Sequence, residues 1–231
     1  MSVNVFGLDL DQPVIAGSLS EFVRIFRQNG WLRAVKSFFR HFLFDRPAQQ
    51  DLSDFLDSTF GSKFTFDQSR LVVGNASSEA VWERIPFKPE VVFSFRVLEH
   101  VPPHDLSILV ERLAIILSKN AIAYFVITVH TGLIGNHLTE WYPHRVYQAG
   151  KKSEPWEHLR KNRYSADTYL NGMTRRAYAA LFSQHFEILV DEELNPKLGE
   201  EYLTADIESE LSEFDRYELL SNDVLFVLRK N

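Results

Sequence analysis

Two continuous apolar runs with an amphipathic segment between them constrain the fold of this chain more than any other feature. The first run is Glu90–Phe95, and the second, Ala121–Val129, is the strongest strand candidate in the sequence. Strands that are apolar on both sides are typical of parallel sheets with helices on both faces. Asp105–Leu117, between the runs, places leucines at helical spacing. The pattern predicts an α/β fold with a mostly parallel sheet.

The remaining segments extend this pattern in both directions. Further strands are expected at Val3–Leu10, Arg70–Val73, Phe186–Val190 and Asp223–Leu228, and helices at Ser20–Phe44 (divided near Asn29-Gly30), Asp51–Phe60 and Thr174–Gln184. We expect one domain over residues 1–231, with a helical insertion at about 13–69 and a second, irregular insertion at about 130–171.

Composition excludes several classes of function. The chain has no cysteine, so disulfides, thiolate zinc sites and a cysteine nucleophile are excluded. The net charge of −6 argues against a nucleic-acid partner, which would need a basic face. No apolar run approaches the roughly 20 residues of a membrane span, and no signal peptide is recognisable. A cytoplasmic protein is the expectation.

The segment FSFRVLEHVP (Phe93–Pro102) carries a family resemblance. It resembles the class I, Rossmann-like S-adenosylmethionine-dependent methyltransferases, and more narrowly the type 11 group. The block LAIILSKNAIAYFVITV (Leu113–Val129) is similar to the next helix, turn and strand of that family, although its turn lacks the usual glycines. The resemblance implies a Rossmann-like, mostly parallel sheet flanked by helices and closed by an antiparallel pair of C-terminal strands.

The resemblance also implies where the cofactor S-adenosylmethionine would bind. Asp9, with Asp11 as its competitor, matches the acid that binds the ribose hydroxyls; capping of the next helix is the alternative. Asn75 and Ala76 match the adenine-binding position, where a simple Gly-Asn turn is the alternative. The residues that match the methionine end of the cofactor are Ser94, Phe95 and Arg96.

One part of the family pattern is missing from the sequence. The family has a first strand and a Gly-x-Gly-x-Gly turn before the strand that ends at the Asp9 position, and here Met1 leaves no room for them. We therefore expect a fold that is incomplete at the N-terminus and weak or absent binding of S-adenosylmethionine. A non-catalytic, methyltransferase-like binding or scaffold module is the alternative function.

Acceptor binding and proton transfer are expected near the second insertion. His100 and His130 are the candidate general bases. The candidate residues for binding a small acceptor, such as a sugar or a lipid-linked molecule, are Glu99, His137, Trp141, His144, Trp156 and Arg160. His130, His137, His144 and His158 lack metal-binding motif spacing, so no metal site is predicted. A loop of hydrogen-bonded histidines and packed tryptophans is the alternative.

Charge is distributed unevenly along the chain. Glu21–Arg46 contains six arginines and lysines against two acids, whereas Glu187–Glu218 is strongly acidic. The basic segment allows three interpretations: a cover for the sheet with a solvated basic face, peripheral contact with a membrane, or pairing with the acidic segment. The acidic run at Asp206–Glu218 is expected to be a solvated helix face.

Overall fold

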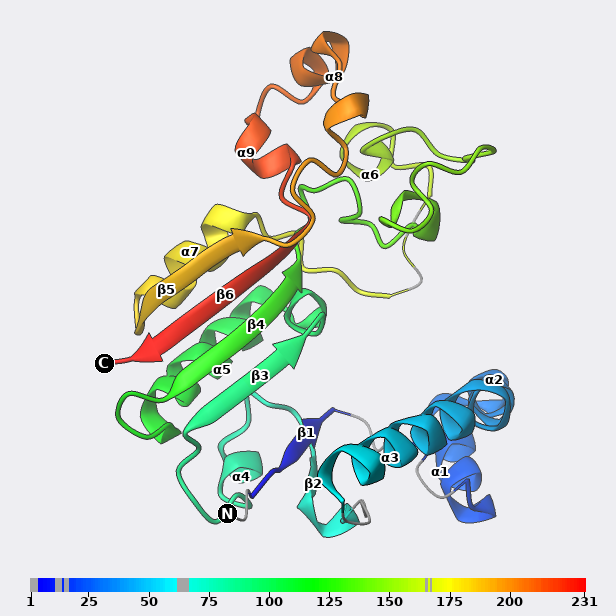
Figure 1. Cartoon of the computed structure of the whole chain (residues 1–231), viewed down its shortest axis with the longest axis vertical. Helices are drawn as coiled ribbons and strands as arrows, with labels where there is room; N and C mark the ends of the chain where they lie inside the picture. Colours follow the sequence, from blue (N-terminus) through cyan, green and yellow to red (C-terminus); the bar gives the residue numbers. More distant parts are fainter. Residues whose placement is uncertain (1–3, 11–13, 15–16, 62–66, 165, 167) are drawn as a thin grey trace. The chain divides into compact units, whose positions relative to one another are not determined.

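The computed structural model describes residues 4–10, 14, 17–61, 67–164, 166 and 168–231 (Figure 1). The chain divides into two compact units, Met1–Ala76 and Ser77–Asn231. Among the helices of the described residues, none combines the length and the apolar character needed to cross a bilayer.

The first unit is built on a short parallel pair of strands. β1 (Gly7–Asp9) pairs with β2 (Leu71–Val73), and Asp9 lies opposite Val73. Parallel neighbours need a long crossover connection. The helices between the two strands provide it: α1 (Leu19–Asn29), α2 (Trp31–Arg40), a π-helical turn (His41–Asp45) and α3 (Arg46–Phe60). Much of the chain between β1 and β2 is therefore helical.

Local sequence explains where these helices begin and end. Ser18 and Glu21 form a capping box at the start of α1, with Ser18 N donating to Glu21 Oε2 at 2.7 Å. Gly30, at φ +82°, separates α1 from α2 as predicted. The expected helix start near Asp51 is wrong. The backbone is already helical at Asp45, so α3 continues the preceding turn and needs no new cap.

The second unit contains a four-stranded sheet in the order β3-β4-β6-β5. β3 (Val91–Phe95) and β4 (Ile122–Thr128) are parallel, while β6 (Asp223–Lys230) runs antiparallel to both β4 and β5 (Phe186–Glu193). The predicted α/β class, the parallel strands and the closing antiparallel pair are confirmed.

Two helices cover one face of this sheet (Figure 1). α5 (Pro103–Ile116) connects β3 to β4, and α7 (Arg175–Ser183) precedes β5. The core under α7 includes Phe125, Phe182 and Phe226, whose neighbouring ring centroids are 5.6 and 5.2 Å apart. Burying one such side chain contributes about 1.5–3 kcal/mol. On the opposite face, the side chains of β3 are exposed, with Phe93 at 74%.

The segments beyond the carboxyl ends of β3 and β4 have a second core of their own. They include α6 (Glu157–Arg160), α8 (Ala205–Glu210) and α9 (Arg216–Leu219), while α4 (Glu79–Trp82) lies before β3. This core contains Leu133, Ile134, Trp141, Val146, Trp156, Leu198, Leu203, Ile207, Leu211 and Leu219. The irregular insertion and the acidic segment therefore pack together. Acids of the Glu187–Glu218 segment form ion pairs with arginines of the same unit, such as Glu187 with Arg229.

Candidate functional site

The segments that leave β3 and β4 lie at the same edge of the sheet, since the two strands are parallel neighbours. Ligands in open α/β sheets bind beyond this edge. β3 is followed by Arg96, at φ +52°, and by the 3₁₀ turn Leu98–His100; the segment after β4 reaches His137, at φ +56°. Non-glycine residues in the left-handed region are uncommon, and they concentrate at functional sites.

Glu99 is a buried carboxylate at this edge. Its exposed fraction is 2%, and neither of its carboxylate oxygens accepts a hydrogen bond from a described residue. Burial raises the pKa of Glu99 above its usual value. An unpaired buried polar group costs about 1–3 kcal/mol, so the buried Glu99 carboxylate destabilises the folded state unless a ligand pairs with it.

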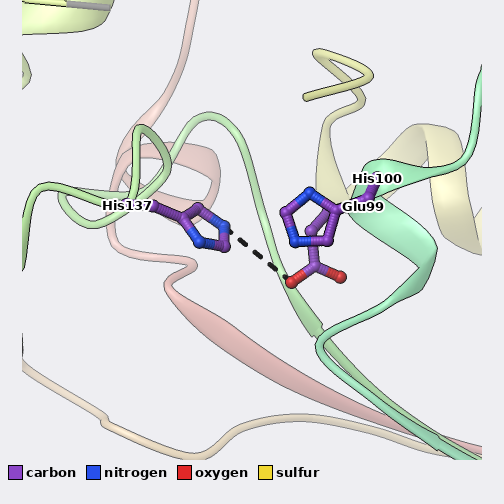
Figure 2. A group of neighbouring side chains, drawn as sticks. All are labelled: Glu99, His100 and His137. Atoms are coloured by element: carbon purple, nitrogen blue, oxygen red, sulfur yellow. Dashed lines mark ion pairs between the residues drawn. The ribbon is translucent and has the colours of Figure 1, made fainter. Parts of the chain in front are cut away.

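Two histidine rings lie beside the Glu99 carboxylate (Figure 2). His137 Nε2 is 3.9 Å from Glu99 Oε1, too far for a hydrogen bond, and is itself buried without a partner among the described residues. The ring of His100 lies 5.1 Å from that of His137, centroid to centroid. Burial lowers the pKa of His137 to about 4, and the neighbouring basic groups of His100 and Arg96 act in the same direction.

His100 is oriented by the loop before α7. Its Nδ1 lies 2.9 Å from the carbonyl oxygen of Tyr169, and because a carbonyl only accepts, Nδ1 carries the proton in this bond. Asn171 holds the 3₁₀ turn Leu98–His100 in place, because its side-chain amide donates to the carbonyls of Leu98 and Val101 at 3.0 and 3.1 Å. Asn171 was not identified from the sequence; its position beside Gly172 is a local signal that could have marked it as a turn residue.

Arg96 is held by an acid from the last strand. Its guanidinium donates to both carboxylate oxygens of Asp223, at 3.1 and 2.5 Å. Asp223 also accepts from Thr128 Oγ1 at 2.8 Å and from Asn195 Nδ2 at 3.1 Å. Arg96 was predicted to contact the cofactor directly; here its charge is neutralised within the chain. Asp223 escaped sequence analysis because it is the first residue of an ordinary strand.

His130 and His158 form a second histidine pair, deeper in the insertion. The Nε2 of His158 donates to the backbone oxygen of His130 at 2.7 Å, and the two rings are 5.1 Å apart. Burial lowers the pKa of both, that of His158 to about 4. The Nδ1 of His130 is buried without a partner among the described residues. The His158 ring therefore has a structural hydrogen bond to the backbone, while the Nδ1 of His130 is available to a ligand.

The other acceptor candidates are spread through the insertion. Trp156 is fully buried and donates from Nε1 to Leu219 O, while Trp141 is 3% exposed and donates to Ser153 Oγ. Arg160 forms ion pairs with Glu154 and Glu210, and His144 is exposed. Of the predicted acceptor residues, only Glu99 and His137 are brought together with His100.

The first unit brings two predicted cofactor positions together. Asp9 ends β1, and its backbone oxygen accepts from Gly74 N at 2.9 Å, just after β2. Asn75 is exposed beside this contact and Ala76 is half-buried. Asp11 lies outside the described residues. In the second unit, Ser94 and Phe95 form the carboxyl end of β3, with Ser94 half-buried and Phe95 exposed.

Comparison with known proteins gives similarity only at the level of solved structures. No protein-family model and no curated protein matches the chain. Three similar structures are a candidate methyltransferase from Haloferax volcanii in complex with a methyltransferase activator (16% identity, TM-score 0.37), a methyltransferase from Methanosarcina mazei (17%, 0.37) and the plantazolicin methyltransferase BamL (14%, 0.39). The matches cover 71%, 77% and 75% of this chain.

The chain spans 63% of the Haloferax protein and 62% of BamL, less than two thirds of either, and 76% of the Methanosarcina protein. Likeness at this level does not carry a function. The fold is described by its own topology: a mixed α/β sheet in which β3 and β4 are parallel and β6 runs antiparallel to β4 and β5.

Proposed function

We propose that this chain is an S-adenosylmethionine-dependent methyltransferase domain that acts on a small-molecule acceptor bound beyond the carboxyl ends of β3 and β4. One observation carries the proposal: at this edge of a methyltransferase-type sheet, the side chains of Glu99 and His137 present buried polar atoms that no described residue satisfies. Such atoms are costly in the folded state, which is accounted for if a ligand uses them.

The first unit supports a role for Asp9 in binding the nucleoside of the cofactor. An exposed carboxylate that ends a parallel strand can accept hydrogen bonds from two ribose hydroxyls. The Gly74-Asn75 turn lies beside it, joined by the Gly74 N to Asp9 O hydrogen bond. Asn75 would accept from the adenine amino group, and Ala76 would offer its backbone amide. Ser94, Phe95 and Arg96 remain the positions predicted for the methionine end.

S-adenosylmethionine supplies the methyl group in this reaction. The protein contributes alignment of the acceptor and exclusion of water, which are the main requirements of a direct displacement. A base is needed only for an acceptor that must lose a proton, such as a hydroxyl. His100 suits this role because the bond to Tyr169 holds its proton on Nδ1 and leaves Nε2 as an acceptor. His130, with its unused nitrogen, is the second candidate.

Titration with S-adenosylhomocysteine tests the proposal, and concentrations up to millimolar are appropriate because the sequence predicts weak or absent binding, of which the proposal requires the first. We expect saturable binding that Asp9→Ala weakens at least tenfold. Asp54→Asn, on α3, is the matched control and should leave binding unchanged. If neither S-adenosylmethionine nor S-adenosylhomocysteine binds at millimolar concentration, the chain is not a methyltransferase and the non-catalytic module is supported.

A lipid-linked acceptor is a second candidate, favoured by the surface of α1 and α2. These helices expose large apolar side chains, including Phe26 at 55%, Trp31 at 61% and Phe39 at 58%. They line an apolar groove formed by Phe22, Val23, Phe26, Ala34, Val35, Phe38 and Phe39. Basic residues such as Lys36 and Arg40 lie on the same helices. Apolar and basic side chains on one helix are typical of contact with anionic membranes.

A further inference from the structure

We infer that Glu99, His100 and His137 form a binding site for one divalent transition-metal ion, with zinc as the probe ion. The carboxylate and the two imidazoles each offer one donor atom, and the three atoms lie within 4.8 Å of one another. This inference does not depend on methyl transfer, because metal binding can be measured without S-adenosylmethionine or an acceptor.

The position of the cluster favours a ligand. Glu99 and His100 belong to the 3₁₀ turn after β3, and His137 belongs to the segment after β4, so two chain segments converge on one point (Figure 2). The backbone of His137 is in the left-handed region, at φ +56°. This uncommon backbone conformation occurs at the residue whose ring faces the Glu99 carboxylate, and such conformations concentrate at functional sites.

The unpartnered atoms show what the cluster lacks. Both oxygens of Glu99 and Nε2 of His137 are buried, and none has a hydrogen-bond partner among the described residues. His137 Nε2 is 3.9 Å from Glu99 Oε1, which is too long for the two groups to satisfy each other. A bound cation would satisfy the carboxylate and the imidazole lone pairs at the same time.

The second histidine has the hydrogen bonding that is usual for a metal ligand. A metal-binding histidine generally donates its other ring N–H to a carbonyl or carboxylate, which fixes the tautomer and the ring orientation. His100 Nδ1 makes this bond to Tyr169 O at 2.9 Å and leaves Nε2 as the donor for a metal. When an ion is bound there, His100 Nε2 no longer serves as a base, and His130 is the remaining candidate.

Ligand type and geometry indicate the class of ion. Two imidazoles and one carboxylate are a donor set of catalytic zinc and non-haem iron sites, and they leave coordination positions open for water or an acceptor oxygen. Donors on a tetrahedral zinc ion are about 3.4 Å apart, given bonds of about 2.0–2.2 Å. Closing the cluster around an ion needs side-chain movements of roughly 1 Å, which rotamer adjustments provide.

Calorimetry with zinc, and absorption spectroscopy with cobalt as its visible substitute, test the site on the full chain. We expect one ion per chain, and an increase in the thermal unfolding midpoint when the ion is added. Glu99→Gln and His137→Ala should each weaken binding at least a hundredfold. His104→Ala, which removes an exposed histidine outside the cluster, is the matched control and should bind as the wild type does.

Circular dichroism of the metal-free variants separates loss of the site from loss of the fold. Glu99→Gln keeps the size of the side chain, so a folded variant that no longer binds zinc supports the site. The inference is overturned if the wild type binds no ion, or if folded Glu99→Gln and His137→Ala still bind as the wild type does. A wild type that binds zinc but not S-adenosylhomocysteine would retain the metal site and reject the methyltransferase proposal.

Discussion

The guanidinium of Arg96 and the carboxylate of Asp223 form a two-point ion pair between the residue that follows β3 and the first residue of β6. Their side chains are 33% and 2% exposed. The pair joins two strands that do not neighbour each other, because β4 lies between them. It lies at the sheet edge beside the Glu99 cluster and fixes the backbone from which that cluster starts.

Asp223→Ala should destabilise the fold by about 3 kcal/mol, because it leaves a half-buried arginine without its counter-ion and removes the acceptor of Thr128 and Asn195. Urea unfolding measures the effect. Glu187→Ala is the matched control, since Glu187 pairs with Arg229 at the surface of the same sheet, with 47% and 44% exposure; exposed pairs contribute about 0–1 kcal/mol. Equal losses in the two variants would contradict this ranking.

His158 should make the fold sensitive to acid. Burial lowers its folded pKa to about 4, against an ordinary value of 6.5, so the unfolded chain takes up a proton first as the pH falls. The contribution of the neutral ring is complete above the ordinary pKa and is lost as the pH falls from about 6.5 to about 4, roughly 3 kcal/mol in total. His158→Gln should flatten the free energy of unfolding against pH in this window. His144→Gln, at an exposed position, should leave the slope of the wild type.

Glu193 should act in the opposite direction. Burial, with repulsion from Asp223, raises its pKa to about 7. The folded chain therefore keeps a proton that the unfolded chain has released, and stability falls as the pH rises from about 4.5 to about 7. Glu193→Gln should flatten this fall. Between acid pH and about pH 7, the free energy of unfolding should decrease less in the variant than in the wild type. Because His158 and Glu193 oppose each other, each effect is read from the difference between variant and wild type. An unchanged pH profile in Glu193→Gln would show that the carboxyl titrates normally.

The exposed apolar side chains of α1 and α2 should support binding to anionic vesicles. The wild-type chain should sediment with phosphatidylserine-containing vesicles. Its binding to them should weaken with added salt, as expected for a basic amphipathic surface. Phe39→Ser should reduce binding several-fold, and Phe87→Ser, at an exposed position of the second unit, should not. Equal binding to neutral and anionic vesicles would argue for simple hydrophobic adsorption instead.

Much of the fold was predictable from local sequence. Val91–Phe95 and Ile122–Thr128 form strands as their apolar runs predicted, although one face of Val91–Phe95 is exposed and not covered. Gly30 divides α1 from α2 because glycine adopts the positive φ that this junction needs. The start of α3 was not predictable in this way. Asp51 has the chemistry of a cap, but an unbroken helix from the preceding turn made a cap unnecessary.

The sequence by itself determined the α/β class, the parallel strands with their connecting helix, and Glu99-His100 as residues that follow an apolar strand. Only the tertiary structure decided that His137 meets them, that Asp223 pairs with Arg96, and that Asn171 fixes their turn. Periodicity reports which side of an element is buried. It does not report which residues meet when segments separated by a helix and a strand return to one edge, because strand order and register fix those distances.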